Sequence, residues 1–545
     1  MKPSILLVCC FLLALTACTS KAAASTSSTD PLAGADFILV TPNDMPSATP
    51  FQPSSLTLPP PPLEDGQSAT ATPLSTETPT LEPPPTPIPS NTSTSSVQAL
   101  PTFTPLPTDT VAPIPISGDK PQYLITALLD YTGHTVVVSE TILYPNTSND
   151  ALSSLLLGVN PMLWTDTFHL QNVLVNDQRW DGYTLSGQNL TISLPTPLQP
   201  GQAVKLGVSY SLSLPYSNGK FENFGYTTRQ VTLIDWYPFV VPYISGVGWV
   251  LPEPYPYGEN LVYPEADFRV SLSFADPAHA PVVAASAPAS LENGALVYVL
   301  PDARNFSIAA SPEFLVSSAD AGGVTIYSYC FPEDAAAAAM ALEMTRMAVN
   351  TYSASFGPYV HNTLTVVETD LNDGLETDGL YFLARNFYRA WPGGVQNNLA
   401  DIAVHETAHQ WWYGAVANNQ ATEPWLDEAM ATYSEHVFYE TNYPGLVNWW
   451  WNFRVNSKNP SGAVDLRLYD TATFQGYVGA VYFQGANFFD ALRLRIGDAA
   501  FFAFLRDYYA RERGGISSAA AFFAILDQHT DADYSDLLRT YFYYR

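Results

Sequence analysis

Short runs of alternating apolar and polar residues fill the middle of the chain. Examples are His134–Leu143, Leu190–Leu194, Val204–Leu212 and Arg269–Phe274, with Pro and Gly residues at the breaks. Because successive side chains of a strand point to opposite faces, this period of two predicts β-strands with one buried face. Residues 119–318 are therefore predicted to form an antiparallel β domain, either a sandwich or a saddle.

The pattern changes after residue 318. Apolar runs at Val324–Tyr329 and Thr363–Glu368 predict two strands, and the Ala-rich segment from Asp334 to Tyr352 predicts a long helix between them. Beyond Asn398 nearly all of the chain has helical periodicity. We therefore expect residues 319–545 to form a mostly helical domain with strands at its start, which makes the fold class α+β multidomain.

The beginning of the chain has the features of an export signal. Lys2 precedes an apolar run from Ile5 to Leu15, which is shorter than a membrane span and typical of a signal-peptide core. The run ends in Leu-Thr-Ala-Cys18, which resembles a bacterial lipoprotein box; the alternative is an ordinary signal peptide with a small-residue cleavage site. Residues 1–17 are predicted to be the signal peptide and Cys18 the lipidation site.

Residues 18–118 are dominated by Pro, Ser and Thr, and no Tyr or Trp occurs before Tyr123. Such a segment cannot bury enough apolar surface to offset the entropy lost on ordering. It is predicted to be a disordered tether that joins a lipid anchor in the membrane to the folded domains. We therefore expect an extracytoplasmic, membrane-anchored protein on the cell surface or the periplasmic side.

The net charge of the chain excludes some classes of binding partner. The chain has 51 acidic and 22 basic residues, for a formal net charge of -29. This charge argues against nucleic acid and anionic lipid headgroups as partners, because both are polyanions. Cys330 is the only cysteine beyond residue 18, so the sequence has no disulfide framework and Cys330 is interpreted as a buried thiol.

A metal-binding motif occurs at His405-Glu406-Thr407-Ala408-His409. Histidines four positions apart lie on the same helical face, so both imidazoles can reach one ion. Glu406 stands about 100° around the helix from His405, where it suits a general base that activates the attacking water. Asn398 is the predicted cap of this helix and Asp401 lies in its first turn. The alternative is a chance match on a helix that buries two histidines.

A catalytic zinc ion takes three protein ligands and keeps one position for water, so a third ligand is required. Glu428 supplies it, in the segment Trp-Leu-Asp-Glu-Ala at 425–429. Pro424 suits the first turn of a second helix, and an unpaired carboxylate among apolar neighbours would be costly. We predict one Zn²⁺ per chain, held by His405, His409 and Glu428.

These motifs resemble a known family. His-Glu-x-x-His, then eighteen residues, then Glu is the zinc signature of gluzincin peptidases of the aminopeptidase N and leukotriene A hydrolase type. Residues 409–412 (His-Gln-Trp-Trp) and 425–429 are also similar to that family, which usually has Asn where Asp427 stands and Gly where Ala429 stands. The resemblance covers residues 120–545. It implies a β saddle domain followed by a thermolysin-like catalytic domain, here in a short bacterial lipoprotein form.

The resemblance also implies a receptor for the free amino group of a substrate. The family binds that group with the Glu of a Gly-Ala-Met-Glu-Asn loop, and Glu376 falls on this Glu, two residues after Gly374. Asp373 and Thr377 depart from the first Gly and the Asn. Gln230 is matched to a family Gln of the β domain that helps to bind the amine. The alternative interpretation of the loop is a solvated acidic turn.

Tyr482, in Tyr-Phe-Gln-Gly at 482–485, resembles the family tyrosine whose hydroxyl hydrogen-bonds the oxyanion. Tyr477 and Tyr469 are competing candidates, and a packed core tyrosine is the alternative. Other conspicuous residues are interpreted as loop or core positions: Arg385, Glu423 and the three tryptophans at 449–451.

The sequence thus predicts a zinc metallopeptidase that removes N-terminal residues from peptides with a free N-terminus. Glu406 serves as the base and Tyr482 stabilises the oxyanion. One rival is a related hydrolase with endopeptidase or epoxide-hydrolase specificity, which would have no use for Glu376. The other rival is a non-catalytic peptide-binding lipoprotein, and the complete ligand set with Glu406 argues against it.

Overall fold

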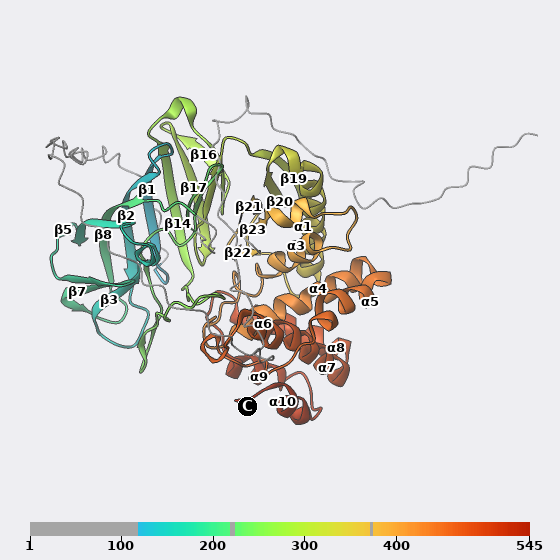
Figure 1. Cartoon of the computed structure of the whole chain (residues 1–545). Coiled ribbons are helices and arrows are strands. Elements are labelled where there is room, and N and C mark those ends of the chain that lie inside the picture. Colours follow the sequence, from blue (N-terminus) through green and yellow to red (C-terminus); the bar gives the residue numbers. More distant parts are fainter. Residues whose placement is uncertain (1–117, 218–223, 371–373, 545) are drawn as a thin grey trace, which may run out of the picture.

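The computed structural model describes residues 118–217, 224–370 and 374–544. A β-rich region packs against a region that is first mixed and then helical (Figure 1). The predicted signal peptide, the tether and Cys18 lie outside the described residues.

The largest sheet has eight strands, and its central members have the alternation read from the sequence. β2 and β8 bury every second residue and leave the others partly or fully exposed, and they pair antiparallel along their full length. One pairing differs from the antiparallel expectation, because β1 and β14 run parallel. The spatial order is β16 (Ala289–Glu292), β17 (Ala295–Ala303), β14 (Ala266–Phe274), β1 (Gln122–Asp130), β2 (Thr135–Pro145), β8 (Ala203–Ser213), β4 (Phe168–Val175) and β5 (Gln178–Arg179).

Three smaller sheets complete the β domain. They contribute to one apolar core with the large sheet, centred on side chains such as Leu157, Leu206 and Trp236. The first has the order β15 (Val282–Ala285), β18 (Ile308–Ser311), β10 (Val231–Leu233) and β9 (Phe224–Tyr226). The others are β11 (Phe239–Val240), β3 (Leu152–Gly158), β7 (Asn189–Leu198) and β6 (Tyr183–Ser186), and the pair β12 (Tyr243–Ile244) with β13 (Gly248–Trp249).

The second domain opens with a five-stranded sheet that begins before the predicted boundary at residue 319, because β19 starts at Leu315. Its order is β19 (Leu315–Ala321), β20 (Val324–Cys330), β21 (Thr363–Thr369), β23 (Leu380–Ala384) and β22 (Leu375–Thr377). β20, β21 and β23 are parallel neighbours, while β19 and β22 form antiparallel edges. Cys330 at the end of β20 is buried, as predicted.

Helices follow and form the second apolar core. α1 connects the parallel strands β20 and β21. α3 packs against α1, and α4 packs against α3 (Figure 1). The helices are α1 (Ala335–Ser355), α2 (Arg385–Arg389), α3 (Asn398–Ala408), α4 (Glu428–Asn442), α5 (Val447–Trp450), α6 (Phe474–Val478), α7 (Gly485–Ile496), α8 (Asp498–Glu512), α9 (Ala519–Leu526) and α10 (Ser535–Tyr541).

A third apolar cluster joins the two domains. Ile234, Val282 and Ala309 of the β domain pack with Val367 and Leu380 of the five-stranded sheet. Because this contact is buried and lies under β22, it fixes that edge strand relative to both domains. β22 carries Glu376, so the domain junction also positions one side of the candidate site.

Candidate metal centre and active site

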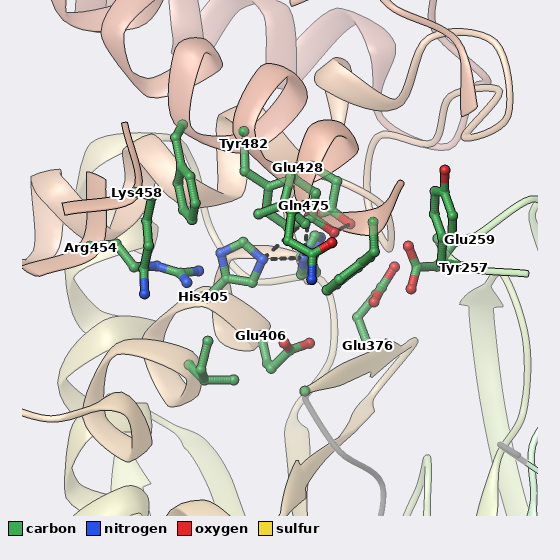
Figure 2. Close-up of a pocket in the computed structure, with 18 residues that line it drawn as sticks. Tyr257, Glu259, Glu376, His405, Glu406, Glu428, Arg454, Lys458, Gln475 and Tyr482 are labelled. Atoms are coloured by element: carbon green, nitrogen blue, oxygen red, sulfur yellow. Dashed lines mark hydrogen bonds and ion pairs between the residues drawn. The ribbon is translucent and has the colours of Figure 1, made fainter. Parts of the chain in front are cut away.

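A cavity of about 500 Å³ lies between the two domains. Its lining comes from the loop before β14, the edge strand β22, helices α3 and α4, and the segments around residues 451–458 and 474–483 (Figure 2). The volume lies within the range of binding pockets for small ligands. The sequence motifs separated by more than a hundred residues therefore meet in one concave site.

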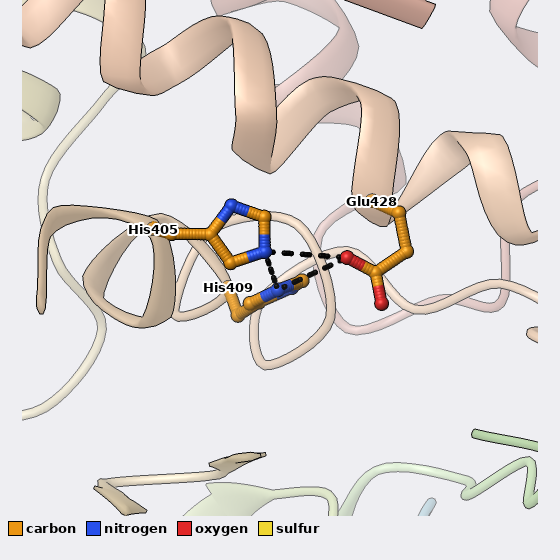
Figure 3. A group of neighbouring side chains, drawn as sticks. All are labelled: His405, His409 and Glu428. Carbon is orange, nitrogen blue, oxygen red and sulfur yellow. Dashed lines mark hydrogen bonds and ion pairs between the residues drawn. The ribbon is translucent and has the colours of Figure 1, made fainter. Parts of the chain in front are cut away.

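His405, His409 and Glu428 converge in this cavity (Figure 3). The two Nε2 atoms are 3.1 Å apart, and Oε2 of Glu428 lies 3.3 Å from Nε2 of His405 and 3.5 Å from that of His409. All three side chains are buried. We call these three residues the metal centre.

The spacing fits zinc. With ligand bonds of about 2.0–2.1 Å and tetrahedral angles, ligand atoms stand about 3.3–3.4 Å apart. The three observed separations, 3.1, 3.3 and 3.5 Å, surround this value. Two neutral imidazoles and one carboxylate are a donor set found in catalytic zinc sites, with a fourth position left for water. The residues present therefore fit a single catalytic Zn²⁺.

A buried carboxylate orients His405. Nδ1 of His405 lies 2.8 Å from Oε1 of Glu435, which also accepts hydrogen bonds from Arg454 and from Nε1 of Trp450. Although burial alone would raise it, Arg454 and His405 hold the pKa of the Glu435 carboxyl below its ordinary value. An ionised Glu435 accepts a hydrogen bond from the Nδ1–H of His405, and this tautomer leaves the lone pair of Nε2 free to face a metal.

Asp427 does the same for His409. Its Oδ1 lies 2.6 Å from Nδ1 of His409, and its Oδ2 accepts a hydrogen bond of 2.7 Å from Nε2 of Gln420. The same Gln420 nitrogen is 3.1 Å from Oε1 of Glu376. Asp427 is where the sequence departs from the family's Asn, and here its carboxylate is an acceptor that fixes the imidazole tautomer.

Glu406 projects into the cavity beside the histidines (Figure 2). Gly374 leaves the room for it, because a Cβ at that position would lie 1.8 Å from Oε1 of Glu406. The helix that carries the motif is α3, and its cap differs from the prediction. Asn397, one residue before the predicted Asn398, accepts the hydrogen bond from the Ala400 amide at 3.1 Å.

Glu376 lies across the cavity from His405, in the edge strand β22 (Figure 2). Burial raises the pKa of its carboxyl well above the ordinary value, and the nearby carboxylate of Glu259 raises it further. Glu259 comes from the β domain and lines the same cavity. Two carboxyl groups at one end of a buried pocket could accommodate a cation, since a bound ammonium would stabilise their ionised form.

Tyr482 is the tyrosine that the structure places at the metal centre. Its hydroxyl donates a hydrogen bond to Oε1 of Glu428, and its ring stacks on His405. Burial and the Glu428 carboxylate keep the pKa of Tyr482 well above the ordinary value, so the hydroxyl stays protonated. Tyr477 packs in the core behind it, and Tyr469 donates to the Glu253 carbonyl away from the cavity.

Gln230 is not brought to the site. It is fully buried, its amide lies 3.4 Å from the carbonyl oxygen of Glu368, and it is absent from the cavity lining. The residue that the β domain contributes instead is Glu259, in the loop that also carries Tyr257. Glu259 could not be predicted from the sequence, because a single acid between Gly258 and Asn260 has no distinctive spacing.

Other residues interpreted as loop or core have definite places. Trp450 supports Glu435, as described above. Arg385 forms buried ion pairs with Asp334 and Glu368 near the domain junction. Glu423 accepts from the Ala519 amide at the start of α9, outside the cavity. None of the helices in the described ranges is long and apolar enough to cross a membrane.

Fold and site together define the class of zinc metallopeptidases. The family model described as "Peptidase family M1 domain" matches residues 341–541, which include the metal centre, Glu406, Glu376 and Tyr482. That segment is therefore similar to the M1 peptidase domain.

Solved structures of M1 zinc metallopeptidases from Deinococcus radiodurans have the same two-domain fold. One, a mutant form, has a TM-score of 0.56 and 21% identity, covering 78% of this chain and 94% of the other. A second, described as bound to a Tyr-Ser-Ala substrate, has a TM-score of 0.55 and 20% identity, covering 77% and 93%. Aminopeptidase M1-C from rice (Oryza sativa subsp. japonica) is 23% identical over 155 residues, which span 27% of this chain and 18% of the rice protein.

Proposed function

We propose that this protein is a zinc-dependent aminopeptidase that removes N-terminal residues from peptides. The observation that carries the proposal is the pair Glu376 and Glu259, which closes one end of the cavity beside the metal centre. A carboxyl pair there can bind the free ammonium of a peptide and set the scissile bond one residue inward. The related structure described with a bound Tyr-Ser-Ala substrate is consistent with a peptide in this site.

The residues of the chain divide the chemical work. His405, His409 and Glu428 would hold a Zn²⁺ ion, which would act as a Lewis acid and lower the pKa of a water to about 7. Glu406 accepts the proton of the attacking water and then delivers it to the leaving amine. The protonated Tyr482 hydroxyl, which donates to Glu428 in the structure, would turn to donate its hydrogen bond to the oxyanion instead. Glu435 and Asp427 keep the imidazoles in the tautomer that leaves Nε2 unprotonated.

The test compares free and N-acetylated forms of the same peptide in wild type and in Glu376→Gln. A charge-assisted hydrogen bond to a buried carboxylate contributes about 1.5–3 kcal/mol. We therefore expect Glu376→Gln to lower kcat/KM on free-amine peptides about 10- to 100-fold. Zinc content should not change, because Glu376 is not a ligand, and cleavage of acetylated peptides should be nearly unaffected.

Two results would change this assignment. Equal cleavage of acetylated and free peptides by wild type would replace the aminopeptidase with an endopeptidase. If wild type demands a free amine but Glu376→Gln has full activity, then Glu259 is the main receptor, and Glu259→Gln should show the loss instead.

We further propose that the enzyme acts outside the cytoplasm, held at a membrane by a lipid on Cys18. Support comes from the sequence alone, through the signal-like run before Cys18 and the Pro/Ser/Thr-rich segment after it.

A further inference from the structure

The two ends of the cavity differ in chemistry, with basic side chains at one end and carboxyl groups at the other. Figure 2 shows Arg454 and Lys458 on one side of His405 and the acids Glu376 and Glu259 on the other, and all of them line the cavity. The basic side is unexpected in a chain with 51 acidic and 22 basic residues. The metal centre therefore lies between the proposed ammonium receptor, Glu376 with Glu259, and the basic end, Arg454 with Lys458.

Lys458 supplies the net positive charge of the basic end. Arg454 donates from Nε and Nη2 to Glu435, whose carboxylate neutralises it. For Lys458, no ion pair to any carboxylate of the described ranges 118–217, 224–370 and 374–544 is present at 4.0 Å or less. Its side chain is exposed, at the end of a helical turn that borders the cavity. The ammonium of Lys458 is thus available to a ligand.

We propose that Lys458 binds a carboxylate of the peptide on the side of the scissile bond that leaves, so the site favours short, unblocked peptides. This inference rests on the proposed aminopeptidase function, because an ammonium at Glu376 fixes the direction of the chain. An extended peptide advances about 3.3–3.6 Å per residue, so the C-terminus of a di- or tripeptide emerges from the metal centre toward the basic end. A short peptide with both termini free has the charge pattern of the cavity.

The same carboxylate chemistry has two sources. One is the C-terminal carboxylate of a di- or tripeptide, and the other is an acidic side chain after the scissile bond. Since Lys458 is exposed and its charge is partly screened by water, we expect a preference of about three- to tenfold in either case. The preference should weaken at high salt.

The experiment measures KM for Ala-Ala and Ala-Ala-Ala, for their C-terminal amides, and for the amidated pair Ala-Asp and Ala-Asn. Wild type should show a lower KM for the acids, and in Lys458→Gln the amide-to-acid KM ratio should fall toward one. Lys205→Gln, which removes a lysine charge from the surface of the β domain, is the matched control and should keep the wild-type ratio. If Lys458→Gln changes the KM ratio of the C-terminal acids and amides, then Lys458 binds the C-terminal carboxylate. If it changes the KM ratio of the Asp and Asn peptides, then Lys458 binds the acidic side chain.

A binding measurement separates this inference from the proposed function. In Glu406→Gln, which should bind peptides without turnover, calorimetry gives the Kd of Ala-Ala and of its amide directly. A tighter Kd for the acid that Lys458→Gln abolishes supports the carboxylate site even if no peptide is cleaved. Equal Kd and KM for acids and amides in wild type would overturn it, while cleavage of the amides would leave the aminopeptidase proposal standing.

Discussion

Glu406 and His405 are neighbours in the chain, yet their proposed roles separate cleanly by experiment. His405 is a proposed ligand whose Nε2 points toward His409 and Glu428, whereas Glu406 lines the cavity beside it. A ligand holds the ion, and a base only moves a proton. Substitution of His405 should therefore remove both the zinc and the activity, whereas substitution of Glu406 should remove the activity alone.

We expect His405→Ala to lose zinc and activity together, because two remaining ligands hold zinc poorly. Glu406→Gln should keep one zinc per chain and lose about 10²- to 10⁴-fold in kcat. Metal analysis and an aminoacyl chromogenic substrate give both values, with chelator-treated wild type as reference. His279→Ala, at an exposed position of the β domain, is the control. A Glu406→Gln enzyme with most of its activity would refute the general-base role.

The residues predicted from sequence were those with a fixed spacing. His405, His409 and Glu428 could be found because ligands of one ion must recur at helical intervals or in a recognisable segment. Glu435 was missed although it lies seven residues after Glu428 on the same face of α4, a spacing that could have predicted it. Glu259 could not be predicted, because it reaches the site only through tertiary packing. Gln230 shows the opposite error, since a match by residue type alone placed a core glutamine in the site.

Helical segments with unusual winding border the cavity. Residues Trp451–Val455 and Gly479–Gln484 are π-helical, and they carry Arg454 and Tyr482. A π-turn inserts a residue into a helix and rotates the side chains that follow, which is one reason such turns occur at functional sites. The alternating pattern predicted the strands well, but winding of this kind depends on packing and leaves no periodic signal in the sequence.

Gly485 allows the segment that carries Tyr482 to pack closely against α4. A Cβ at this position would lie 2.2 Å from Cβ of Ala429, the residue after the ligand Glu428. Gly485→Ala should therefore push α7 away from α4, destabilise the fold by about 1–3 kcal/mol and displace the tyrosine. Urea denaturation measures the first effect and kcat the second. Gly445→Ala, where an added Cβ meets nothing within 4 Å, should unfold like wild type; equal midpoints for both variants would contradict the close contact.

At the scale of the molecule, Arg304 of the β domain adds polar contacts between the two domains to those of the apolar cluster. Arg304 is buried and follows β17 directly. Its guanidinium donates to the carbonyls of Gly414, Ala415 and Gly515 at 2.9 Å each, all in the catalytic domain. The site lies between the domains, so this contact helps to keep Glu259 opposite the metal centre.

Arg304→Leu removes the guanidinium donor from these carbonyls, and each buried carbonyl left without a partner costs about 1–3 kcal/mol. Ala415 and Gly515 keep the amides of Gly514 and Ala417 as donors. We expect a stability loss of about 3 kcal/mol or more, read from urea denaturation, and a higher KM as the β domain loosens. Arg179→Leu, which removes an arginine from the exposed surface, is the control. An unchanged urea midpoint for Arg304→Leu would show that apolar contacts alone hold the domains together.

The part of the chain before residue 118 carries the proposed lipid anchor. If Cys18 is lipidated, the protein should sediment with membranes, and Cys18→Ala should move it to the soluble fraction after export. Continued membrane association of Cys18→Ala would refute the anchor. Deleting residues 30–115 should leave kcat/KM on small peptides unchanged, because the metal centre, its supporting carboxylates and both ends of the cavity all belong to residues 257–483. A deletion variant that stays anchored but loses activity on small peptides would show instead that the segment contributes to the catalytic domains directly.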